Sequence, residues 1–157
     1  MPQGIRPTQD KVRKALFDIL GDVEGLSFLE LYAGAGAVGL EAASRGGREL
    51  VMVEYDRACL QVIRRNMESL TPRACELYPK QADAVIQLLH KDARRFDLIF
   101  LDPPYYQGLS KKTLQTLGAY DILAPDGFVV VQHFKGDEVP VTEGALQLVK
   151  QSRYGDT

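Results

Sequence analysis

Three glycines in the pattern GxGxxG constrain the fold of this chain most strongly, because they stand between an apolar run and a helical segment. The apolar run covers residues 27–31, and the glycines are Gly34, Gly36 and Gly39. Glycine allows positive φ and a close approach of the main chain to a ligand or a packed element. A strand, a tight turn and a helix in this order predict the first half of a βαβ unit, which belongs to a parallel sheet.

The same alternation of apolar runs and amphipathic segments continues along the chain. It predicts strands at 27–31, 50–54, 74–78, 96–101 and 127–134. Helices are predicted at 8–20, 40–45, 83–90 and 110–117, with another after Asp56 as its N-cap. We therefore predict one α/β domain with a doubly wound, Rossmann-like, mostly parallel sheet and helices on both faces. In such a fold the ligand site lies at the carboxyl ends of the strands.

The composition fits a single soluble domain. The chain has 157 residues, of which 45% are hydrophobic and 25% are charged, and no apolar run approaches the length of a membrane span. Cys59 and Cys75 lack metal-ligand spacing and the N-terminus lacks a secretion signal, so we expect a cytoplasmic protein without a metal site. With 19 basic and 21 acidic side chains, any contact with nucleic acid has to come from a local basic face.

Residues 147–154 resemble one more strand, and Tyr154, Gly155 and Asp156 supply turn residues at its end. We expect a final antiparallel strand over residues 147–154, whose hairpin partner is missing. A sheet that ended at this strand would have an open edge unless another element covered it.

Glu54 ends the second predicted strand, 20 positions after Gly34. A carboxylate at this position can accept hydrogen bonds from both ribose hydroxyls of an adenosine-containing cofactor. A glycine-rich turn without a ligand does not explain this acid. The pattern alone does not separate NAD from S-adenosylmethionine, but Glu30 at the loop entrance favours the latter, because it repels a pyrophosphate and attracts an ammonium group.

Asp83 follows the third predicted strand and has two compatible interpretations: an acceptor for the adenine amino group and the N-cap of the helix 83–90. Asp56 is interpreted as a cap. The predicted cofactor-binding residues are Glu30, Tyr32, Ala33, Gly34, Gly36, Glu54, Tyr55, Asp83 and Ala84.

The tetrapeptide Asp102-Pro103-Pro104-Tyr105 follows the apolar strand 96–101, so it lies on the same edge of the sheet as the glycine loop. An amino group on a nucleobase is a poor nucleophile until hydrogen-bond acceptors draw its lone pair out of the ring. The Asp102 carboxylate and the Pro103 carbonyl are such acceptors, and consecutive prolines fix the direction of the carbonyl. Tyr105 offers a ring on which an extruded base can stack. The sequence therefore predicts methyl transfer to an exocyclic amino nitrogen.

With these motifs the chain resembles the bacterial small-subunit (16S) ribosomal RNA guanine-N2 methyltransferases of the RsmD type. The likeness lies in residues 6–17, 31–42, 53–56 and 100–105. It implies guanine N2 as the acceptor, S-adenosylmethionine as the cofactor and S-adenosylhomocysteine as its product. Members of this family begin with a basic, glycine-containing hairpin and continue through a last strand after the turn. Neither is present here, which we expect to affect RNA affinity and activity but not the cofactor site.

We expect a monomer that binds ribosomal RNA, within an assembled or assembling small subunit, and no membrane. The candidate RNA-binding residues are Arg6, Lys11, Arg13 and Lys14. Other interpretations remain open: an N6-adenine or N4-cytosine methyltransferase, a non-catalytic RNA-binding module, and an NAD-dependent oxidoreductase. The last of these has no use for the tetrapeptide 102–105.

Overall fold

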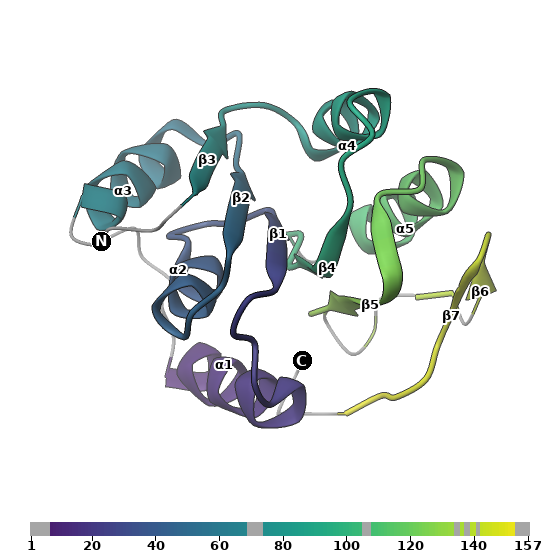
Figure 1. Cartoon of the computed structure of the whole chain (residues 1–157), viewed down its shortest axis with the longest axis horizontal. Coiled ribbons are helices and arrows are strands. Elements are labelled where there is room, and N and C mark those ends of the chain that lie inside the picture. The colour runs from purple at the N-terminus through teal and green to yellow at the C-terminus, as the bar shows by residue number, and fades with distance from the viewer. Residues whose placement is uncertain are drawn as a thin grey trace.

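In a computed structural model of the chain, five parallel strands form one sheet with helices on both faces (Figure 1). The structure describes residues 7–68, 74–104, 108–133, 136, 139–140 and 142–152, with side chains from residue 10 onward. Arg6 and Tyr105 therefore lie outside the described residues. No helix in the described part of the chain is long and apolar enough to cross a membrane.

The strand order in the sheet is β3-β2-β1-β4-β5. In chain order the elements are α1 (Pro7–Leu20), β1 (Ser27–Leu31), α2 (Ala37–Ser44), β2 (Glu49–Val53), α3 (Arg57–Glu68), β3 (Cys75–Tyr78), α4 (Ala82–Lys91), β4 (Phe96–Leu101), α5 (Leu109–Ala119), β5 (Leu123–Val131), β6 (Thr142–Glu143) and β7 (Leu146–Gln147). Because β1 pairs with both β2 and β4, the strand order reverses beside β1. The predicted fold class is confirmed, and the reversal is the point at which such sheets bind ligands.

Two apolar cores, one on each face of the sheet, hold the helices in place. Alternate residues of β1 point to opposite faces, so Leu29 and Leu31 belong to the core under α4 and α5, whereas Phe28 belongs to the other core. Figure 1 shows α1, α2 and α3 on the side opposite α4 and α5. All five residues of β1 are buried, as expected for the central strand of a parallel sheet covered on both faces.

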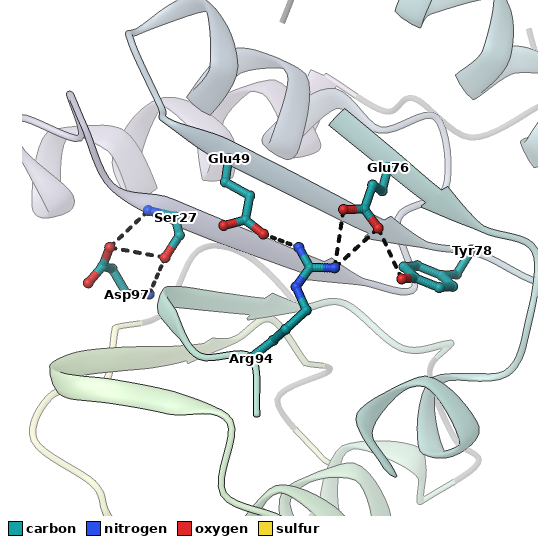
Figure 2. Close-up of polar contacts among 6 residues, drawn as sticks. All are labelled: Ser27, Glu49, Glu76, Tyr78, Arg94 and Asp97. Atoms are coloured by element: carbon teal, nitrogen blue, oxygen red, sulfur yellow. Dashed lines mark hydrogen bonds and ion pairs between the residues drawn. The ribbon is translucent and has the colours of Figure 1, made fainter. Parts of the chain in front are cut away.

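Polar contacts join neighbouring strands near their amino ends (Figure 2). Arg94, just before β4, forms ion pairs with Glu49 at the start of β2 and with Glu76 in β3. The Asp97 carboxylate in β4 accepts hydrogen bonds from the backbone N–H and the hydroxyl of Ser27, at 2.8 and 3.1 Å. These contacts lie away from the carboxyl ends of the strands, where the sequence predicts the site.

The start of β5 differs from the prediction. The strand begins at Leu123, which pairs with Phe96, and the register then shifts before Phe128 pairs with Leu98. Asp126 has a φ of 63° within this irregularity. The sequence Pro-Asp-Gly resembles a turn before a strand, but here it forms a bulge within an edge strand, where a proline is tolerated.

The prediction of a strand over 147–154 is wrong in its described part. Only Leu146–Gln147 is extended, as β7, and it pairs antiparallel with β6 in a separate two-stranded sheet. Residues 148–152 have no regular secondary structure, and residues 153–154 lie outside the described part. Leu148 and Val149 are 45% and 76% exposed, so these two apolar side chains are not packed against the described part of the sheet.

Candidate active site

The glycine-rich loop after β1 has the backbone that its composition predicts. Gly34 and Gly36 have φ values of 59° and 78°, and Gly36 is the N-cap of α2. A Cβ added at Gly36 would lie 3.1 Å from the Met52 sulfur, whereas one added at Gly34 would meet nothing within 4 Å. Gly36 is therefore needed for packing as well as for its backbone conformation. The main chain at Gly34 is open to a ligand.

Gly39 has a packing role at the third glycine position. A Cβ there would lie 2.8 Å from Leu50 and 2.9 Å from the Glu30 carboxylate. Both contacts are too short for any larger residue without movement of a buried neighbour. The glycine thus allows α2 to approach β1 and β2 closely, which brings the first turn of the helix over the buried carboxylate.

Tyr32, which the sequence predicts as a cofactor-binding residue, has a strained backbone. Its φ is 56°, in the left-handed region that a bulky side chain rarely adopts. Its hydroxyl shares a hydrogen bond of 2.7 Å with Thr113 of α5. This bond connects the loop after β1 to the helix that follows Asp102 and Pro103. The sequence gives no signal for it, because the partners are 81 positions apart.

Glu54 lies just beyond β2 and fixes the loops around it. Its Oε1 accepts a hydrogen bond of 2.8 Å from the backbone N–H of Gly34, and its Oε2 accepts bonds of 2.8 Å from Tyr55 and Asp56. Oε1 keeps a second acceptor position, whereas Oε2 already accepts two bonds, so Glu54 can also bind a hydroxyl group of a ligand through Oε1. Tyr55 is 65% exposed beside it. The structure thus brings the predicted acid and the glycine loop together.

Glu30 is only 2% exposed and lies beneath α2 rather than open at the loop entrance. Its Oε1 accepts a hydrogen bond of 3.2 Å from the backbone N–H of Gly39. Burial, with a smaller contribution from the charges of Asp102 and Glu54, raises the pKa of Glu30 from 4.5 to about 8. Glu30 is therefore mainly protonated at neutral pH and acts on this region through its contact with α2.

Asp102 and the prolines occupy the carboxyl end of β4, next to the end of β1. Asp102 is half-buried, Pro103 is buried and Pro104 is exposed. Burial raises the pKa of Asp102 from 3.8 to about 7. Asp102 and Glu54 form a group of three carboxyl groups with Glu30, since each of the two is within electrostatic reach of Glu30. Such a group favours a cationic ligand and opposes an anionic one.

Asp83 is not the N-cap of α4, and that part of its interpretation is wrong. The cap residue is Gln81, and Asp83 lies inside the first helical turn. Its carboxylate accepts a hydrogen bond of 3.2 Å from Thr116 and lies 3.3 Å from the Lys112 ammonium, both in α5. Ala84 is exposed beside it. The helix begins one residue earlier than predicted, which turns Asp83 toward α5.

Asp56 caps α3 as predicted. Its Oδ1 accepts a hydrogen bond of 2.9 Å from the backbone N–H of Cys59, three residues later. This cap sets the start of α3 directly after Glu54 and Tyr55.

The basic residues predicted on α1 have different environments. Lys11 and Lys14 are exposed. Arg13 forms ion pairs of 3.3 Å with Asp10 and 3.1 Å with Glu41 of α2, so its charge is already partnered. Sequence reasoning missed a second basic surface, on α3, although the spacing of its arginines is visible in the sequence. Within the described ranges, no group of three or more His, Cys, Asp or Glu side chains could hold a metal ion.

Comparison with known proteins places the chain in a family. A sequence model described as "Conserved hypothetical protein 95" matches residues 1–157. "Putative rRNA methyltransferase YlbH" of Bacillus subtilis (strain 168) is 34% identical over 97% of this chain and 84% of its own length. "Ribosomal RNA small subunit methyltransferase D" of Escherichia coli (strain K12) is 32% identical over 97% of this chain and 76% of its own length.

The fold agrees with a solved structure of similar sequence. A conserved hypothetical protein from Streptococcus pyogenes superimposes with a TM-score of 0.82 at 32% identity, covering 92% of this chain and 89% of that one. These matches extend over nearly the whole chain and confirm the resemblance drawn from its motifs. The chain belongs to the Conserved hypothetical protein 95 family, the family of ribosomal RNA small subunit methyltransferase D.

Proposed function

We propose that this chain transfers a methyl group from S-adenosylmethionine to the N2 amino nitrogen of a guanine in small-subunit ribosomal RNA. The observation that carries this proposal is the position of Asp102 and Pro103 at the end of β4, beside the glycine loop that Glu54 holds. An acceptor for an amino group and a site for an adenosine cofactor thus share one edge of the sheet. Family membership supplies the class of substrate.

The residues around the loop fit S-adenosylmethionine better than NAD. The charges of Asp102 and Glu54 already disfavour ionisation of Glu30, so a pyrophosphate would add negative charge where negative charge is crowded. A cofactor with a sulfonium and an ammonium group relieves this crowding. The open side of Gly34 leaves room for such a ligand, and Glu54 can accept a hydrogen bond from a ribose hydroxyl. When bound, the cofactor supplies an electrophilic methyl group.

The chain's own residues would orient the acceptor nitrogen. The Asp102 carboxylate accepts a hydrogen bond from the amino group, and the Pro103 carbonyl accepts a second one. Together they hold the nitrogen lone pair toward the methyl donor and stabilise the positive charge that develops on nitrogen. Tyr105 would stack on the extruded base, as the sequence predicts. Asp83 and Tyr55 would complete the adenine side of the cofactor site.

The proposed RNA substrate is presented as a folded or protein-bound surface of the small subunit. The net charge of the chain is −2, and Lys11 and Lys14 are the exposed basic residues on α1. These two α1 charges alone neutralise few phosphates, so α1 supplies little affinity for unstructured RNA. A preformed surface lowers that demand, because the RNA need not be ordered on binding.

Two measurements test this function. Thermal unfolding with S-adenosylhomocysteine should show a stabilised protein, by about 2.7 kcal/mol at 100 times the dissociation constant, and NADH at the same concentration should not. Labelled methyl groups should then pass from the cofactor to small ribosomal subunits that lack the modification, but not to free nucleotides. Stabilisation by NADH alone, or no transfer in the presence of a bound cofactor, would overturn the proposal.

A further inference from the structure

The exposed side of α3 carries three arginines, two of which lie one above the other along the helix. Arg57, Arg64 and Arg65 are all exposed, whereas Leu60 and Ile63 on the other side of the helix are buried against the sheet. Residues seven apart in a helix lie on the same side, two turns from each other. We call Arg57, Arg64 and Arg65 the α3 arginine stripe. At about 1.5 Å per residue it extends for about 12 Å along the helix.

The stripe differs from most other arginines in the described part of the chain, because its charges are not partnered. Four arginines form ion pairs with carboxylates of the fold: Arg13, Arg45, Arg94 and Arg95. By contrast, no ion pair joins a member of the stripe to a described acidic side chain, although Glu68 lies four residues after Arg64. The three arginines are therefore exposed and form no ion pair with the carboxylates that the structure describes.

Contacts at both ends of α3 connect it to the candidate active site. The helix begins directly after Glu54, Tyr55 and the cap residue Asp56. Near its other end, the Asn66 side-chain amide donates a hydrogen bond of 3.1 Å to the Ala35 carbonyl in the glycine loop. A polyanion bound along the stripe would therefore be held by the helix that borders the cofactor loop, on the side of this helix that faces away from Asn66.

The stripe is a separate surface from the lysines of α1. α2 lies between the two helices: Arg13 of α1 pairs with Glu41 of α2, and Ile63 of α3 packs beside Gly36 at the start of α2 (Figure 1). Lys11 and Lys14 thus lie on one side of α2 and the stripe on the other. The near-neutral net charge of −2 makes such local concentrations of positive charge the means by which this chain can attract a polyanion.

We infer that the α3 arginine stripe binds the phosphate backbone of the RNA substrate, an inference that rests on the proposed function. A guanidinium group binds phosphate with two parallel hydrogen bonds, which a solvated surface lysine does not reproduce. Contacts of this kind fix the position of the nucleic acid and carry no base specificity. The stripe would therefore hold RNA flanking the target nucleotide, while Asp102 and Pro103 act on the base.

The variant Arg64→Gln/Arg65→Gln tests this inference and leaves Arg57, next to the cofactor side, in place. Binding of an unmodified small-subunit ribosomal RNA transcript is measured over a range of salt concentrations. Each lost phosphate contact should lower the slope of log K against log salt by about 0.7 and the affinity about fivefold at 0.1 M salt, so about 25-fold for the pair. The affinity for S-adenosylhomocysteine and the melting temperature should stay at wild-type values.

The matched control is Lys91→Gln/Lys150→Gln, which also removes two exposed positive charges. Lys91 is on α4, on the opposite face of the sheet, and Lys150 lies after β7. This variant should bind RNA with nearly the wild-type affinity and salt slope. Wild-type binding by the stripe variant, or an equal loss in the control, would overturn the inference.

The result is independent of the test of the proposed function. If the wild-type protein methylates the RNA and the stripe variant binds it as tightly as wild type, only the stripe inference fails. If the stripe variant loses RNA affinity but the wild-type protein transfers no methyl group, the catalytic proposal fails and the RNA surface stands. A wild-type protein that does not bind the transcript would overturn the stripe inference directly.

Discussion

The backbone N–H of Gly34 donates a hydrogen bond of 2.8 Å to Glu54 Oε1, which joins the loop after β1 to the end of β2. The same carboxylate accepts two further backbone N–H groups, from Tyr55 and Asp56. Glu54 therefore has a structural task in the free protein in addition to its proposed contact with ribose. This double role shapes the first prediction.

Glu54→Ala should weaken binding of S-adenosylhomocysteine at least about tenfold, because hydrogen bonds to a charged acceptor contribute about 1.5–3 kcal/mol each. It should also lower the melting temperature, since three N–H groups lose their acceptor. Glu54→Gln keeps a carbonyl oxygen for the loop and should recover most of the stability but little of the affinity. Titration calorimetry measures both variants, and an unchanged dissociation constant in Glu54→Ala would remove this residue from the cofactor site.

The rate of methyl transfer should depend on pH through the protonation of Asp102. Burial raises the pKa of its carboxyl to about 7, so below that pH the group is protonated and becomes a weaker, uncharged acceptor for the amino group. We expect kcat/KM, which reports the free enzyme, to rise with pH and to level off above about 7. Asp102→Ala should bind S-adenosylhomocysteine normally while turnover falls at least about a hundredfold. Equal losses of affinity and rate would instead make Asp102 a scaffold residue.

Glu30 should make the folded protein less stable as pH rises. The unfolded chain releases this proton near pH 4.5, whereas the folded protein keeps it until about pH 8. Folding therefore takes up a proton between these values, and the free energy of unfolding falls across this window, by up to about 1.4 kcal/mol per pH unit. Glu30→Gln cannot titrate and should lack this component. Denaturant unfolding at pH 5 and at pH 8 compares the two proteins, and parallel pH profiles would contradict the assignment.

Much of this arrangement could be predicted from the sequence, because parallel strands end at the same edge of a sheet. That rule brings Glu54 and Asp102 to the glycine loop without any knowledge of side-chain contacts. The role of Asp83 could not be predicted in the same way. A shift of one residue in the start of α4 decides whether Asp83 caps the helix or lies in its first turn. The ion pair of Arg13 with Glu41 could not be predicted either, because it depends on how α1 packs against α2.

Two errors came from local patterns that tertiary structure overrides. The Pro-Asp-Gly sequence near Asp126 has turn chemistry but forms a bulge, because Leu123 pairs with Phe96 before it. The apolar residues Leu148 and Val149 predict a strand but have no sheet edge beside them in the described structure. Strand propensity reflects packing against neighbours, which a single sequence does not specify.

The bond between Tyr32 and Thr113 should stabilise the link between the cofactor loop and α5. Thr113 is fully buried, so Tyr32→Phe leaves its hydroxyl without this partner and should lower the free energy of unfolding by about 1–3 kcal/mol. Thr113→Val should have a similar effect. The double variant should lose less than the sum of the two, which a double-mutant cycle by denaturant unfolding measures. Strictly additive losses would mean that the bond contributes nothing to stability.

Methyl transfer to guanine N2 is tested by identifying the product nucleoside. Small ribosomal subunits that lack the modification are incubated with the protein and a methyl-labelled cofactor, and the RNA is digested and analysed by mass spectrometry. Asp102→Ala serves as the control and should give no labelled nucleoside above background. We expect N2-methylguanosine as the labelled product. N6-methyladenosine or N4-methylcytidine as the sole product would contradict the assignment of the base, and no methylated nucleoside from wild-type protein that binds S-adenosylhomocysteine would contradict the enzymatic function itself.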